Sequence, residues 1–168
     1  MNQDNDAPSY RAPAGACIGH VHLKVANLSR AVAFYRDVLG FGLMAKMGDS
    51  AAFLGAGDYH HHIGLNIWES RNGTPPPPGC TGIYHLAILY PTRKDLAVAV
   101  RRALDAGTTF VGAADHGVSE AVYFEDPDSN GVELYWDRPR DQWPKRPDGS
   151  LDIYTHPLDL PALLKLGS

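Results

Sequence analysis

Two histidines occupy equivalent positions in two copies of one sequence pattern. The first copy begins at Ile18 and reads IGHVHLKVANLSRAVAFYRDVLGFG, and the second begins at Ile83 and reads IYHLAILYPTRKDLAVAVRRALDAGTT. Each copy has a short β-branched run, a polar break, an amphipathic helical pattern and a glycine, and its third residue is a histidine, His20 or His85. Because an internal repeat places both histidines, we expect them to meet across a pseudo-twofold axis.

A carboxylate that reaches the same point would complete a metal site. Glu133 lies in the segment GVELYW, and a carboxylate among apolar residues is costly to bury unless it is paired or binds a cation. The matching segment of the first copy, IGLNIW, has no acid before Trp68. Two imidazoles and one carboxylate form the ligand set of non-haem Fe(II) sites, so we predict one divalent ion, Fe(II) before Mn, Co, Zn or Ni.

His22 is the alternative ligand in the first copy. It shares a face of the predicted strand with His20, because strand side chains alternate. The repeat favours His20, since the residue equivalent to His22 in the second copy is the apolar Ala87.

Further candidate catalytic residues surround this triad. His60, His61 and His62 are consecutive in a predicted strand, so they cannot all face one way, and we expect at least one to point into the site. His116 lies in a glycine-containing loop, and Tyr123 follows in the next strand, ten positions before Glu133. Tyr123 is equally well explained as a core aromatic residue.

The elements that must position these residues form two βαβββ halves, residues 17–73 and 82–137, joined by the proline-rich run TPPPPG. Ser29 and Thr92 are suitable N-caps for the two helices, and Gly40 and Gly107 suit the positions after them. We therefore predict an α+β fold in which paired βαβββ modules form a curved, partly closed mixed sheet around a metal cleft. The predicted strands are 17–25, 42–47, 50–55, 60–68, 83–89, 108–112, 120–125 and 131–137, and the predicted helices are 29–39 and 92–106.

Segments outside these halves have different characters. Residues 1–16 lack a basic-then-apolar signal pattern and are expected to be disordered. Residues 138–168 are proline-rich at first and then read PLDLPALLKL, which predicts a short helix packed on the domain or on a partner. This tail could cover the cleft as a lid or form a dimer contact.

Composition excludes several classes of partner. The 168 residues carry a net charge of −4, which gives no electrostatic reason to expect nucleic acid or an anionic membrane. No apolar stretch is long enough to span a bilayer. Cys17 and Cys80 are isolated thiols without a secretory signal, which favours a reducing cytoplasm and no disulfide. Symmetric dimers are the commonest oligomers, so the apolar tail favours a homodimer.

The start HVHLKVANLSRAVAFYRDVLGF and the end YFEDPDSNGVELYW resemble the signatures of the vicinal oxygen chelate superfamily, which includes glyoxalases, bleomycin resistance proteins and extradiol dioxygenases. The resemblance covers residues 17–137. It implies paired βαβββ units around one divalent metal, with ligands at His20, His85 and Glu133, in agreement with the repeat.

The segments YHHHIGLNIW and DHGVSEAVYFEDPDSNGVELYW are most similar to extradiol ring-cleaving dioxygenases. This resemblance implies Fe(II), a small catechol-type aromatic substrate and O2, with catalytic roles for His61 or His62, for His116 and for Tyr123. Many of these dioxygenases contain two domains of this kind, and only one is present here. Glyoxalases carry a further carboxylate ligand near Ile63–Gly64, and its absence in this sequence counts against a glyoxalase. The alternatives are a glyoxalase-type isomerase or lyase with another divalent metal, and a non-catalytic protein that binds an aromatic ligand.

Overall fold

The computed structural model describes residues 10–167. The expected disorder of residues 1–9 lies outside this range, and residues 10–20 contain no helix or strand. The first half contains β1 (Val21–Lys24), α1 (Leu28–Ala33) with the π-helical turn η1 (Phe34–Val38), β2 (Gly42–Met47), β3 (Ala51–Gly55) and β4 (Ile63–Asn66). The second half contains β5 (Leu86–Leu89), α2 (Arg93–Asp105), β6 (Thr109–Asp115), β7 (Ser119–Glu125) and β8 (Gly131–Asp137). The C-terminal segment adds η2 (Arg140–Gln142), β9 (His156–Pro157), α3 (Leu160–Leu164) and η3 (Lys165–Gly167).

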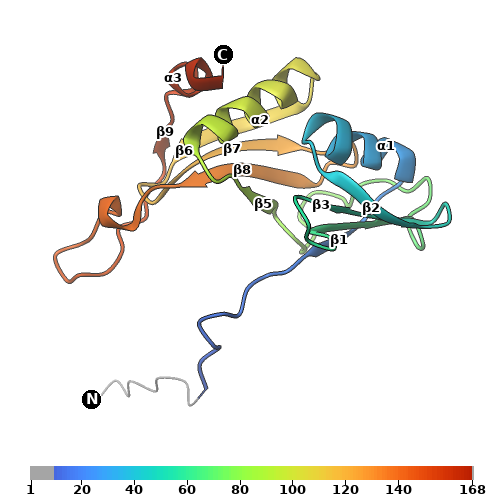
Figure 1. Cartoon of the computed structure of the whole chain (residues 1–168), viewed down its shortest axis with the longest axis horizontal. Coiled ribbons are helices and arrows are strands. Elements are labelled where there is room, and N and C mark those ends of the chain that lie inside the picture. Colours follow the sequence, from blue (N-terminus) through green and yellow to red (C-terminus); the bar gives the residue numbers. More distant parts are fainter. Residues whose placement is uncertain (1–9, 168) are drawn as a thin grey trace.

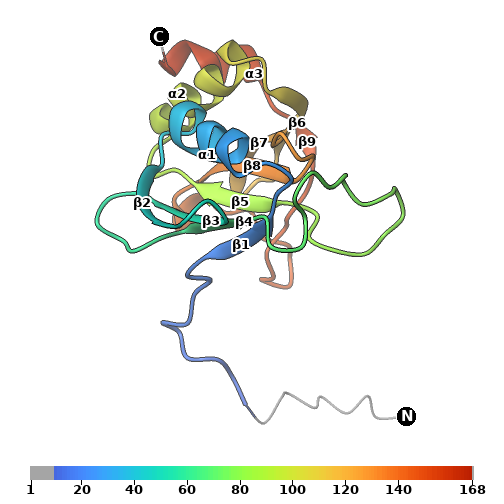
Figure 2. The same cartoon turned by 90° about the vertical axis from the view of Figure 1, so that its right-hand side faces the viewer.

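Each half folds into a sheet with the same connectivity. The first sheet has the order β1-β4-β3-β2, and the second has the order β5-β8-β7-β6-β9. In both sheets the first strand of the half runs parallel to the last, while the remaining pairs are antiparallel. The three α-helices lie on one side of the sheets (Figures 1 and 2). The predicted α+β class with paired βαβββ modules is confirmed.

One of the two predicted N-cap residues of the helices is confirmed. Thr92 caps α2, since its side chain accepts a hydrogen bond from the Asp95 amide at 3.1 Å. The prediction of Ser29 as the first N-cap is wrong: Asn27 has this role, because its Oδ1 accepts from the Arg30 amide at 3.0 Å. An Asn side chain can reach the third amide of a helix from the residue before it, which leaves Ser29 inside the first turn.

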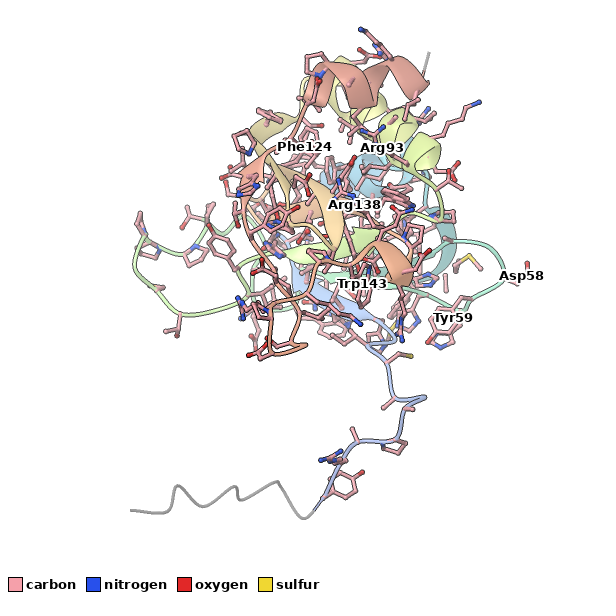
Figure 3. The ribbon with its side chains drawn as sticks, turned by 90° about the vertical axis from the view of Figure 1, so that its left-hand side faces the viewer. Asp58, Tyr59, Arg93, Phe124, Arg138 and Trp143 are labelled. Carbon is pink, nitrogen blue, oxygen red and sulfur yellow. The ribbon has the colours of Figure 1, made fainter. Side chains whose placement is uncertain are left out.

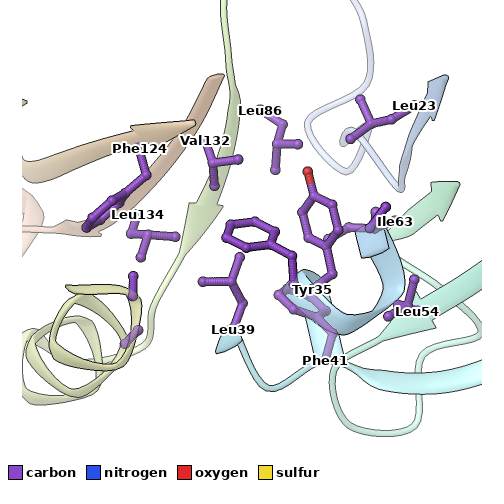
Figure 4. Packing of buried hydrophobic residues seen from close by; sticks show 14 of the residues in the cluster. Leu23, Tyr35, Leu39, Phe41, Leu54, Ile63, Leu86, Phe124, Val132 and Leu134 are labelled. Atoms are coloured by element: carbon purple, nitrogen blue, oxygen red, sulfur yellow. The ribbon is translucent and has the colours of Figure 1, made fainter. Parts of the chain in front are cut away.

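The two halves are joined at the helical layer. The Tyr35 hydroxyl donates to Asp126 Oδ2 at 2.9 Å in the interior, and Arg102 of α2 donates to the carbonyls of Asp37 and Val38 at 2.6 and 2.9 Å. Burial raises the pKa of the Tyr35 hydroxyl well above its ordinary value, and the charge of Asp126 adds to this shift. Tyr35 lies between buried residues of both halves (Figure 4), so one hydrophobic core extends across the junction.

The two sheets do not join into the single curved sheet that the sequence predicts. Within residues 10–167, β1 pairs only with β4 and β5 pairs only with β8, so each keeps one free edge. The reason lies in the junction: helices and the turn at Asp126–Asn130 connect the halves, and within residues 10–167 no strand pairing joins β1 to β5, the strands that directly follow His20 and His85.

The C-terminal segment returns to the second half. Its helix α3 packs on α2, where Leu163 is fully buried and an Arg101 guanidinium N–H donates to the Leu164 carbonyl at 2.8 Å. The predicted short helix is therefore confirmed, packed on the domain. Both Cys17 and Cys80 are exposed free thiols. In the described part of the chain, no helix has the length and apolar character needed to cross a membrane.

Candidate metal centre

One face of the second sheet carries most of the predicted chemistry. Glu133 of β8 lies beside Ala87 of β5 on one side and beside Tyr123 of β7 on the other. Side chains at paired positions point to the same face of a sheet, whereas Val132 and Leu134 point to the opposite face. That opposite face packs against α2, and both residues are buried there. Alternation along β8 thus separates the candidate site from the core.

His85 and Glu133 form a close pair on this face. Their Nε2 and Oε2 atoms are 2.8 Å apart, and Glu133 is only 9% exposed. Two ligands held at about 2.1 Å from one ion, at right angles, lie about 3 Å apart. The spacing of these two atoms is therefore compatible with two ligand positions of one divalent ion, which would compensate the burial of the carboxylate.

Tyr123 and His116 extend this arrangement. The Tyr123 hydroxyl lies 2.7 Å from His116 Nε2 and 3.5 Å from Glu133 Oε1. Burial, together with the negative charge of Glu133, raises the pKa of Tyr123 to about 12, so the phenol is protonated at neutral pH. The Tyr123 hydroxyl thus faces two polar side chains, His116 and Glu133.

His20 lies in the other half. It precedes β1, and its ring packs against that of His61 with 4.5 Å between centroids. The Nδ1 atoms of His60 and His61 are 2.7 Å apart. The prediction that these consecutive histidines belong to a strand is wrong: residues 60–62 form the loop before β4, which begins only at Ile63, where every strand residue is buried.

Residues of both halves line a groove of about 1090 Å³. His20, His62 and His85 line it, whereas Glu133 does not. The His62 ring is fixed there, because its Nδ1 accepts from the Ala56 amide at 3.2 Å. No three His, Cys, Asp or Glu side chains within residues 10–167 lie together as a metal site would require. One chain thus assembles His85 and Glu133, but it does not add His20 to them.

The register also shows what replaces the carboxylate in the first half. Gly64 pairs with His22 just as Glu133 pairs with Ala87, so Gly64 is the counterpart of Glu133. A Cβ at Gly64 would lie 2.9 Å from the His22 ring, which fills this space. Burial, together with the neighbouring His20, lowers the pKa of His22. In the sequence, the segment IGLNIW has Gly64 at this position and no acid before Trp68, which indicated that the first half lacks a carboxylate ligand.

We expect His22→Ala to retain the bound metal, because His22 packs on Gly64 and has no carboxylate beside it. Elemental analysis of the purified variant would measure this. If His22→Ala lost its metal while His20→Ala kept it, the ligand of the first half would be His22.

Sequence reasoning missed a group of charged residues on the α2 side of the second sheet, opposite the face that carries Glu133. Arg138 donates to Asp115 Oδ1 at 2.6 Å and to Glu120 Oε1 at 2.9 Å, and Arg93 donates to the other oxygen of Glu120 at 2.7 Å. Glu120 is only 5% exposed. Hydrogen bonding to Arg138 holds the pKa of Asp115 below its usual range. Figure 3 shows Arg93 and Arg138 on this side of the molecule. No local pattern brings these residues together, since they come from α2, from the paired strands β6 and β7, and from the residue after β8.

Comparison with known proteins agrees with this architecture. The family described as the glyoxalase/bleomycin resistance protein/dioxygenase superfamily matches residues 17–134, and the chain belongs to this superfamily. It is 37% identical to catechol-2,3-dioxygenase of Bacillus subtilis (strain 168), over 88% of this chain and 51% of that protein. It is 31% identical to biphenyl-2,3-diol 1,2-dioxygenase 3 of Rhodococcus globerulus, over 71% of this chain and 63% of that protein.

The chain thus spans between half and two thirds of the length of these two relatives. Among solved structures, a glyoxalase/dioxygenase from Nostoc punctiforme matches 79% of this chain and 99% of its own, with a TM-score of 0.62 and 21% identity. This last similarity shows the fold.

Proposed function

We propose that this protein is a metal-dependent dioxygenase that cleaves the ring of a small catechol-type diol with O2. The observation that carries the proposal is the buried Glu133, which lies between His85 and Tyr123 with His116 beyond. The sequence similarity to two aromatic-diol dioxygenases supports the same reaction class.

Each residue has a role that its position supports. His85 and Glu133 would hold the divalent ion, Fe(II) by the facial arrangement of two histidines and one carboxylate. When bound, this ion would supply a Lewis acid that lowers the pKa of the diol hydroxyls. Tyr123 and His116 would contact the substrate from the side of β7, and His61 or His62 would approach from the first half as proton carrier.

The third ligand, His20, would come from a second copy of the chain. In one chain the halves meet through helices, and within residues 10–167 His20, in the first half, does not join His85 and Glu133 of the second half. If two copies pair through the free edges of β1 and β5, the first half of one faces the second half of the other. Two equivalent sites would then form, each with His20 from one copy and His85 with Glu133 from its partner.

Exposed apolar residues at the free edges support this association. Ile18 lies two residues before His20 and is 89% exposed, and Ile83 lies two residues before His85 and is 70% exposed. Leu89 at the end of β5 is also half exposed. Free strand edges and exposed apolar side chains are features that proteins usually cover. A second copy offers a partner edge with the same character, because the repeat gives both halves the same connectivity.

We expect Tyr123→Phe to keep fold and metal while turnover falls roughly 10- to 1000-fold, as for the loss of one positioned proton donor. The substitution keeps the ring and removes only the hydroxyl that contacts His116. The measurement is O2 uptake with a catechol that the unmodified protein converts. Wild-type turnover in this variant would show that Tyr123 has only a packing role.

The proposed reaction is tested by anaerobic purification, elemental analysis and a panel of catechols assayed by O2 uptake. Iron at one equivalent per chain with catechol-dependent uptake is the expected result. A redox-inert metal with isomerase or lyase activity would instead support the glyoxalase type, and binding of aromatic ligands without metal or turnover would support a binding protein.

A further inference from the structure

The C-terminal segment crosses the loop that carries His116. This loop connects β6 to β7, and β9 pairs antiparallel with the end of β6, so that His156 lies opposite Asp115. Residues 143–157, here called the strap, thereby return to the edge of the second sheet that lies beside the candidate site.

The strap makes hydrogen bonds to the His116 ring. Nδ1 lies 2.8 Å from the Tyr154 carbonyl oxygen and 3.3 Å from the Thr155 hydroxyl. A carbonyl oxygen can only accept, so Nδ1 must carry the proton. In the neutral ring, Nε2 then has only a lone pair, and it accepts the hydrogen bond from the Tyr123 hydroxyl at 2.7 Å.

The strap is held against the loop from both sides. Gly117 has a φ of +78°, and a Cβ there would lie 2.7 Å from Pro144 and from the Tyr154 ring. On the other side, Arg138 donates to Asp115 and to the Gly117 carbonyl at 3.2 Å. Trp143 is anchored as well, since its indole N–H donates to the Arg138 carbonyl at 2.7 Å. Packing and hydrogen bonds therefore fix the Tyr154 carbonyl in place.

We propose that the strap is a positioning segment that selects the Nδ1–H tautomer of His116, so that Nε2 faces Tyr123 and the site as a hydrogen-bond acceptor. Histidine free in water prefers the opposite tautomer, with the proton on Nε2, so the carbonyl of Tyr154 must determine this choice. The inference rests on the proposed function and deepens it, because His116 then serves the reaction first as an acceptor of hydrogen bonds and protons. Since Nε2 has a single lone pair, a substrate group that binds there must be a donor such as a hydroxyl, and it takes the place of the Tyr123 hydroxyl.

The test is the tautomer itself, measured by long-range ¹⁵N–¹H NMR of the full-length chain, metal-free and again with Zn(II). The His116 signals are assigned by their loss in His116→Gln. We expect the pattern of a neutral ring protonated at Nδ1. A ring protonated at Nε2 would overturn the proposal, and this measurement does not depend on whether the protein is a dioxygenase.

Two double variants test whether the strap selects the tautomer. Pro144→Gly with Tyr154→Gly removes both side chains that pack on Gly117. Pro147→Gly with Ile153→Gly is the matched control, since both residues belong to the strap, are exposed and make no contact with Gly117. We expect the first variant to shift His116 toward the Nε2–H tautomer and to lose about tenfold in turnover, with bound metal unchanged. The control should match the wild type, and an unchanged tautomer in the first variant would refute the role of the strap.

Discussion

Replacing Glu133 by alanine is expected to remove the bound metal and to abolish turnover. Among residues 10–167, Glu133 is the only carboxylate that pairs with His85, and its oxygen lies 2.8 Å from the ring nitrogen. Substituting a residue that merely supports a ligand costs roughly 10- to 100-fold in metal affinity, so losing an anionic ligand should cost at least about 100-fold. Elemental analysis after gel filtration and a titration with Fe(II) or Zn(II) would measure the loss.

The control for this prediction is Glu69→Ala, which removes an exposed carboxylate whose ion-pair partner is Lys24 on the surface. It should retain both metal and turnover. Glu133→Gln adds a second comparison, because it keeps the shape of the side chain and removes the charge. Full metal stoichiometry in Glu133→Ala, with the fold intact, would mean that the pair of His85 and Glu133 is only an ion pair on the sheet surface.

The sequence predicted the local structure of this site well, for a physical reason. The prediction of a strand over residues 131–137 is confirmed by β8, which carries Glu133 beside Tyr123. The interval of ten residues between Tyr123 and Glu133 then becomes a direct cross-strand neighbour pair, because a tight turn connects β7 to β8. Periodicity and turn residues determine such short-range pairings.

Other parts of the site depend on contacts that no local pattern encodes. His116 and Tyr154 are 38 residues apart, and irregular chain carries the strap across the loop. The histidines at 60–62 precede β4 instead of belonging to it, although their apolar successors suggested a longer strand. The repeat correctly predicts two equivalent halves, but not through which surfaces they meet, because both the helical faces and the free strand edges are apolar.

Mixed dimers of two inactive variants are expected to regain activity. Each variant alone, His20→Ala or Glu133→Ala, lacks one ligand in every site and should be inactive. In a dimer of one copy of each, one site has lost both residues, while the other combines His20 from the Glu133→Ala copy with His85 and Glu133 from the His20→Ala copy. Since one of the two equivalent sites is intact, the mixed dimer should show about half the wild-type turnover per dimer.

The experiment uses co-expression with two different affinity tags and purification over both, so that only mixed dimers are assayed. Dimers that carry Glu133→Ala in both copies, each with a different tag, are the control, because no pairing of these copies can restore the carboxylate. If the ion were held within one chain, every site of the mixed dimer would lack a ligand and turnover would stay at the level of the control. Failure to recover any doubly tagged species would equally contradict a shared site, since His20 can reach the partner's Glu133 only in a dimer. Recovery of about half the activity would instead explain why one chain brings His85 and Glu133 together while His20 remains in the other half, before β1.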